Sequence, residues 1–177
     1  MKTLRLIAAL SAALALAGCG FHPLYGHIGN GPGAQAIFAT VYVPPIELER
    51  VGYELRNDLI DGMQARANPD GALYDLKVVL QERNEGIAIQ NELVGTVKEV
   101  EITRYNYTLV AHYQLIERKT QKLVTKGIES SLSAYDVVAS PYATIEAKYQ
   151  AQKNTAADVA EQLRLKLAVY FVQNQAK

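Results

Sequence analysis

The stretch Thr103 to Ile116, TRYNYTLVAHYQLI, decides the fold of this chain. Apolar or aromatic side chains alternate with polar ones along its whole length, and this period of two is typical of a β-strand with one buried face. A second alternating run covers residues 72–83, and Asn84-Glu85-Gly86 predicts a hairpin turn between the two runs. A third run begins at Val124, after a polar turn over residues 119–122. Short connections favour antiparallel pairing of these strands.

The alternation also predicts which side chains share a face of the sheet. Tyr107, Leu109 and Ala111 are predicted to face the core, with Asn106 and Thr108 on the opposite side. In the third run the predicted inward residues are Val124, Ile128, Leu132 and Ala134, and the predicted outward residues are Thr125, Glu129, Ser131 and Ser133. The outward face would then carry mostly short polar side chains, which suits either water or a polar partner surface.

Helical periodicity precedes and follows these strands. Apolar residues at helical spacing predict an amphipathic helix over about residues 48–67, preceded by a short strand over residues 37–43. The apolar residues of that helix are Val51, Leu55, Leu59 and Met63. After the strands, Ser140 as N-cap and Pro141 at the first helical position predict a long final helix. Its expected apolar stripe consists of Ile145, Tyr149, Ala156, Val159, Leu163, Leu167 and Tyr170.

The predicted order is therefore strand, helix, three strands and helix. The apolar face of a sheet and the apolar stripe of a helix must each be buried against another element. We therefore expect an α+β fold, a two-layer sandwich in which two helices pack on one face of a four-stranded, mainly antiparallel sheet. Residues 37–177 are long enough to form it as a single domain.

The start of the chain has the pattern of a bacterial lipoprotein signal peptide over residues 1–18. Lys2 and Arg5 supply positive charge, residues 6–16 form an apolar run, and Leu16-Ala17-Gly18 precedes Cys19, which is the only cysteine. The apolar run is shorter than the roughly 20 residues that a membrane-spanning helix needs. The alternatives are an ordinary secretory signal with an incidental cysteine, or a buried structural thiol.

The lipoprotein pattern implies a covalent lipid on Cys19. Its thiol would carry a diacylglyceryl group and its new α-amine a fatty acid, and two or three chains anchor a protein stably. Residues 19–36 are rich in glycine and proline, which predicts a flexible tether between the lipid and the domain. The residue after Cys19 is Gly20 and not the aspartate that retains lipoproteins at the inner membrane, so we expect an outer-membrane location on the periplasmic side.

Composition and motifs argue against several functional classes. Basic and acidic side chains each number 18, and loss of the signal peptide would leave a small excess of acid, which does not favour nucleic-acid binding. The histidines are His22 and His27 in the tether and His112 on the polar side of a strand. No metalloprotease, serine-hydrolase or paired-carboxylate motif is found, so we expect no enzymatic activity, no metal and no cofactor besides the lipid on Cys19.

Four stretches, in order along the chain, are similar to one known family. They are Cys19–Gly26 (CGFHPLYG), Arg50–Leu59 (RVGYELRNDL), Thr103–Tyr105 (TRY) and Ser133–Thr144 (SAYDVVASPYAT). They resemble the LptE family of lipopolysaccharide-assembly lipoproteins in its alphaproteobacterial form. The resemblance implies a lipoprotein that plugs the outer-membrane β-barrel LptD, helps that barrel to assemble and delivers lipopolysaccharide to the outer leaflet.

The resemblance also implies contact with lipopolysaccharide through basic side chains. The predicted outward face offers Lys77, Arg83 and Arg104, which could converge if their strands pair as neighbours. The alternative is that these residues only keep the face soluble. A different function also stays open, that of a periplasmic lipid-carrying lipoprotein that assists an inner-membrane ABC-type lipid transporter.

Overall fold

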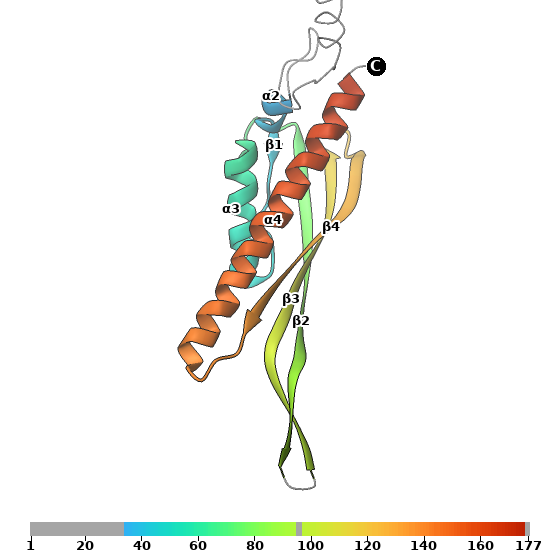
Figure 1. The fold of residues 1–177 in the computed structure, drawn as a ribbon. Helices are drawn as coiled ribbons and strands as arrows, with labels where there is room; N and C mark the ends of the chain where they lie inside the picture. The colour runs from blue at the N-terminus through green and yellow to red at the C-terminus, as the bar shows by residue number, and fades with distance from the viewer. Residues whose placement is uncertain (1–33, 95–96, 176–177) are drawn as a thin grey trace, which may run out of the picture.

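The computed structural model describes residues 34–94 and 97–175 (Figure 1). The predicted signal peptide, Cys19 and nearly all of the predicted tether lie outside these residues. The elements in order are α2 (Ala34–Phe38), β1 (Val41–Tyr42), α3 (Glu49–Met63), β2 (Tyr74–Val94), β3 (Val97–Glu117), β4 (Leu123–Asp136) and α4 (Pro141–Gln175). The sheet has the order β1-β2-β3-β4, with β1 parallel to β2 and the other pairs antiparallel.

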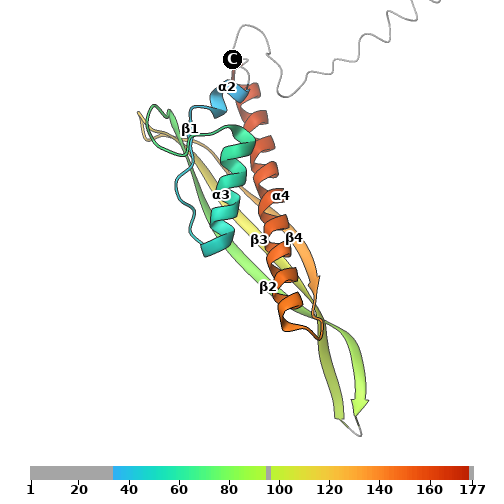
Figure 2. The ribbon, with the colours of Figure 1, turned by 90° about the vertical axis from the view of Figure 1, so that its left-hand side faces the viewer.

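Helices α3 and α4 lie side by side on one face of the sheet, as Figures 1 and 2 show. This confirms the predicted two-layer α+β fold and its element order. The short helix α2 was not predicted, because residues 37–43 have the composition of a strand. Phe38 of α2 is fully buried and its ring packs 6.0 Å from the ring of Phe171, so a tertiary contact overrides the local preference. Strand β1 is reduced to two residues.

The predicted turn at Asn84-Glu85-Gly86 is wrong, because β2 continues through it. Gly86 pairs with Tyr105 of β3, and the two strands stay paired as far as Val94 and Val97. A Cβ atom at Gly86 would lie 2.9 Å from the Cγ2 atom of Ile102, so the glycine makes room for cross-strand neighbours instead of forming a turn. The hairpin of β2 and β3 therefore projects well beyond the helices (Figure 2).

The core lies between the helices and the helix-facing side of the sheet. Helix α3 buries Val51, Leu55, Leu59 and Met63, as predicted. The strands contribute Leu76, Val78, Tyr107, Leu109, Ala111, Tyr113 and Leu115. The hydroxyl of the fully buried Tyr107 donates a hydrogen bond to Glu82 Oε2 at 2.9 Å. Burial, and next the Glu82 carboxylate, raise the pKa of Tyr107 far above its usual value, so the hydroxyl keeps its proton.

Helix α4 begins at Pro141 as predicted, but its buried stripe begins later than expected. Ile145 is 49% exposed and Tyr149 is 37% exposed, whereas Ala151, Thr155, Ala156, Val159, Ala160, Leu163, Leu167, Ala168 and Phe171 are buried. The guanidinium of Arg50, in the first turn of α3, lies 4.5 Å from the Tyr149 ring centre. Because the two helices first meet at this level, the preceding turns of α4 have no helix beside them within residues 34–94 and 97–175.

From Thr125 onward the predicted faces of β4 are reversed, whereas Val124 packs against the core as predicted. Ser131 pairs with Leu109 and Ser133 with Tyr107, so these serines and Thr125 lie on the helix-facing side, while Ile128 and Leu132 point outward. A register shift between Leu115 and Ile116 marks an irregularity in the pairing near the start of β4. Two of the inward polar side chains pair with α4: Ser131 Oγ donates to Asp158 Oδ2 at 2.9 Å, and Glu129 Oε1 lies 3.9 Å from Lys166 Nζ.

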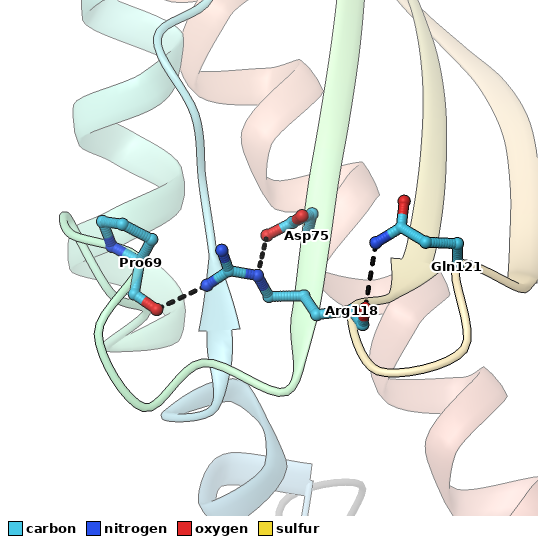
Figure 3. A network of polar contacts seen from close by, with 4 residues as sticks. All are labelled: Pro69, Asp75, Arg118 and Gln121. Carbon is cyan, nitrogen blue, oxygen red and sulfur yellow. Dashed lines mark hydrogen bonds and ion pairs between the residues drawn. The ribbon is translucent and has the colours of Figure 1, made fainter.

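Arg118 joins three segments at the end of the sheet where α2 and the last turns of α4 meet (Figure 3). Its Nε atom lies 3.2 Å from Asp75 Oδ1 of β2, and its Nη1 atom donates to the carbonyl oxygen of Pro69. The side chain of Gln121 donates to the carbonyl oxygen of Arg118 at 2.9 Å. These contacts hold the loop after α3 against the turn between β3 and β4.

Two neighbouring residues of β3 test the one-sided burial. Leu109→Asp should lower the free energy of unfolding by at least about 3 kcal/mol, because it buries an unpaired charge in a fully buried position. Thr108→Asp should stay within about 0.5 kcal/mol of the unsubstituted chain, because Thr108 faces outward and pairs with Arg83. Urea unfolding followed by circular dichroism measures both. Equal destabilisation by the two substitutions would contradict the assignment of faces.

Candidate functional site on the outward face of the sheet

The face of the sheet that turns away from the helices carries all three predicted lipopolysaccharide contacts. We call it the outward face; on β2 it is formed by residues 75, 77, 79, 81, 83, 85 and 87, with their partners on β3 and β4. The register places Lys77 opposite Gln114, Arg83 opposite Thr108 and Arg104 opposite Ile87. Strands β2 and β3 do pair as neighbours, as the prediction required.

The three basic residues are nevertheless far apart along the strands. Arg83 lies six residue steps along β2 from Lys77, which is about 20 Å at the rise of a β-strand. Arg104 lies about 33 Å from the Lys77 level by the same measure. Arg104 Nε is also 2.8 Å from Asp136 Oδ1, and Arg83 Nη1 is 3.4 Å from Glu85 Oε1. The structure therefore does not join these three side chains into one cluster.

Lys77 instead shares a level of the sheet with Lys126 of β4. Gln114 of β3 pairs with both lysines, one on each side, so their backbones are two strand spacings apart, about 10 Å. Neither lysine takes part in the ion pairs found among the described residues. Sequence reasoning missed Lys126 because its place beside Lys77 depends on the register of β4.

Exposed aliphatic side chains lie beside the two lysines. His112 pairs with Val79 on one side and with Ile128 on the other, and these two residues are 64% and 59% exposed. Together they line a shallow hollow of about 550 Å³, which we call the lysine hollow: Lys77, Val79, His112, Tyr113, Gln114, Lys126, Gly127 and Ile128. Leu132, farther along β4, is 58% exposed on the same face. Two cations beside exposed apolar groups suit a ligand that is anionic at one part and apolar at another.

Other kinds of site find no support in the part of the chain that the structure describes. Residues 34–94 and 97–175 contain no group of three potential metal ligands. No helix within the same ranges is long and apolar enough to cross a membrane. Cys19, the predicted lipidation site, lies outside the described residues, so its role stays a prediction.

Comparison with known proteins gives a family. The model of the family described as "LptE: Lipopolysaccharide-assembly" matches residues 38–167. This range contains three of the four stretches on which the resemblance rests, and the Cys19–Gly26 stretch lies before it. Among curated proteins there is no match.

Solved structures share the fold. A putative lipoprotein from Caulobacter crescentus is similar with a TM-score of 0.63 and 23% identity, over 80% of this chain and 96% of that one. Rare lipoprotein B from Shewanella oneidensis gives a TM-score of 0.54 and 8% identity, over 77% and 97%. A minor lipoprotein from Acinetobacter baumannii gives 0.51 and 15%, over 75% and 94%. At these identities the structures establish only the fold, whereas the family model covers well over half of the chain. The chain therefore belongs to the LptE lipopolysaccharide-assembly family.

Proposed function

We propose that this protein is a lipoprotein of the outer membrane, anchored on the periplasmic side through Cys19, that plugs the LptD β-barrel and helps it to assemble and to deliver lipopolysaccharide. Membership of the LptE family supports the general role in lipopolysaccharide assembly. The observation that carries the more specific plug role is the uncovered outward face. The side chains of Val79, Ile128 and Leu132 lie on this face among polar ones, and each of the three is more than half exposed. The same family match favours this proposal over a lipid carrier for an inner-membrane transporter.

The outward face has the mixed character that a barrel lumen would require. The interior of an outer-membrane barrel is polar, so a plug needs hydrogen-bonding groups, with some apolar contact to exclude water. Gln81, Asn106, Thr108 and Gln114 supply the polar groups on this face. The 35 residues of α4 span about 52 Å, so a domain lying along the barrel axis would fill the lumen over the height of the apolar band.

The lysine hollow is the place where we propose that lipopolysaccharide phosphate binds. Lys77 and Lys126 would contact phosphate oxygens as point charges, and Val79 and Ile128 would cover part of an acyl chain. Arg83 and Arg104 remain proposed contacts farther along the face. Each would have to exchange its present carboxylate partner, Glu85 or Asp136, for a phosphate.

Replacement of Cys19 tests the anchor. Cys19→Ser should leave a folded domain that no longer fractionates with the outer membrane in cells depleted of LptD, because no acyl chain can be attached. Density-gradient fractionation measures the distribution, with the unsubstituted chain in the same cells as control. Flotation of the Cys19→Ser protein with outer membranes would contradict the lipoprotein assignment.

Co-purification tests the plug. Thr108→Asp combined with Leu132→Asp should greatly reduce the LptD that elutes with a C-terminally tagged chain, because these paired residues lie on the outward face outside the lysine hollow and two charges would face the barrel wall. Tyr53→Asp is the matched control, since Tyr53 is 64% exposed on α3, on the other side of the molecule. Both proteins should unfold at the temperature of the unsubstituted chain. Full recovery of LptD with the double variant would exclude the outward face as the contact.

Charge reversal tests the lysine hollow. Lys77→Glu with Lys126→Glu should weaken lipopolysaccharide binding at least about tenfold, or about 1.4 kcal/mol, and should reduce its dependence on salt. Lys119→Glu with Lys122→Glu makes the same change of charge on the exposed turn between β3 and β4 and should have little effect. If both double variants lost the same amount of lipopolysaccharide affinity, the loss would come from net charge alone and would contradict a specific site at the lysine hollow. A variant with Arg83→Glu and Arg104→Glu measures the contribution of the remaining predicted contacts.

A further inference from the structure

An apolar hollow lies at the end of the domain where the described chain begins. It has a volume of about 400 Å³ and is lined by residues of α2, the start of β2, the start of β4 and the end of α4. Tyr74, Tyr170 and Phe171 form its aromatic part, with the Phe171 ring 5.8 Å from that of Tyr74 and 5.7 Å from that of Tyr170. Figure 1 shows α2 beside the last turns of α4 at this end, opposite the tip of the β2–β3 hairpin. We call it the α2–α4 hollow.

Thr40 and Asn174, two polar residues of this lining, already donate side-chain hydrogen bonds within the domain. The hydroxyl of Thr40 donates to the carbonyl oxygen of Ile37 at 2.7 Å, and the amide of Asn174 donates to the carbonyl oxygen of Tyr170 at 2.8 Å. The remaining lining is mainly aliphatic or aromatic. An occupant of the α2–α4 hollow would therefore be held by apolar contact.

Leu73 is a fixed apolar wall of the hollow. Its amide donates to the carbonyl oxygen of Thr40 at 2.8 Å, and its carbonyl oxygen accepts from the amide of Arg118 at 2.9 Å. The side chain is nevertheless 57% exposed. The backbone of Leu73 is thus held on both sides, at Thr40 and at Arg118, while more than half of its side chain is exposed. The side chain of Arg118 is itself fixed by Asp75 and Pro69, as Figure 3 shows.

The sequence contains an apolar segment within reach of the hollow. Phe21-His22-Pro23-Leu24-Tyr25 is followed by residues 26–33, which include four glycines and one proline. These eight residues make nine steps from Tyr25 to Ala34 and span at most about 30 Å, so the segment can fold back on Ile37 and Leu73 without strain. Pro23 favours an extended backbone, which lowers the entropy lost on docking. A flexible tether alone would not need this concentration of apolar side chains.

We propose that residues 21–25 dock into the α2–α4 hollow and fasten the N-terminal segment to the domain. Phe21, Leu24 and Tyr25 would cover Leu73 and the aromatic side chains beneath it. If Cys19 is lipidated, as the proposed function holds, only Gly20 would separate the lipid from the docked segment. That end of the domain would then lie level with the periplasmic membrane surface, and the β2–β3 hairpin would point along the barrel axis away from the lipid. The docking itself does not depend on lipidation.

The absence of tryptophan from the chain allows a direct test. The mature chain, residues 19–177, is prepared without lipid as the Cys19→Ser variant, and Phe21→Trp then introduces its single tryptophan. In dilute solution without vesicles, its emission should be shifted to the blue and protected from acrylamide. Leu73→Asp should move the emission to that of solvated indole. Ile128→Asp is the matched control on the outward face and should leave it unchanged.

Hydrogen exchange gives a second, independent measurement. Phe21→Ser, Leu24→Ser and Tyr25→Ser together should speed amide exchange in residues 169–174 relative to Ile28→Ser, a control in the same glycine-rich stretch. Solvated tryptophan emission in the soluble chain would overturn the proposal. So would a blue shift that appears only when anionic vesicles are added, which would place Phe21 in the bilayer. A shift that grows with protein concentration would assign the hollow to a second copy and would overturn it as well.

Discussion

The burial of one face of β3 is the constraint on which the rest of the structure depends. Strand β3 lies between β2 and β4, and its residues Tyr107, Leu109, Ala111 and Leu115 are fully buried. Helices α3 and α4 both lie over this face and exclude water from it, and no other element among the described residues covers the opposite face. Tyr107 can be fully buried on this face because its hydroxyl donates a hydrogen bond to the Glu82 carboxylate.

The reversed faces of β4 connect core packing to the candidate site. Because Ser131 and Glu129 turn toward α4, where Asp158 and Lys166 satisfy them, Ile128 must turn outward. The same register brings Lys126 to the level of Lys77. The register of β4 against β3 therefore produces both the polar contacts with α4 and the lysine hollow. Two lysines and an exposed isoleucine therefore lie close together on the outward face. Such a surface suits an amphiphile, which agrees with a family that takes part in lipopolysaccharide assembly.

The two ends of the domain differ in construction. At one end the Arg118 network, α2 and the last turns of α4 enclose the α2–α4 hollow. At the other end β2 and β3 continue as a hairpin past the last pair with β4, which joins Arg104 to Asp136. The domain is elongated and its two ends differ, so a direction can be defined along its long axis, from the α2–α4 hollow to the hairpin. The proposed docking of residues 21–25 would set this direction with respect to the membrane.

Local spacing in the sequence determined the strand character of residues 103–116, the buried stripe of α3 and the start of α4 at Pro141. Each of these depends on neighbours within a few residues, and together with the four similar stretches they were enough for the fold class and the family. Only the tertiary structure decided the faces of β4, because a period of two is the same whichever side is buried. It also decided the role of Gly86, since glycine serves both as a turn residue and as space for a cross-strand side chain. The pairing of Lys77 with Lys126 was beyond sequence reasoning for the same reason: it depends on register across three strands, and register is set by packing against α4.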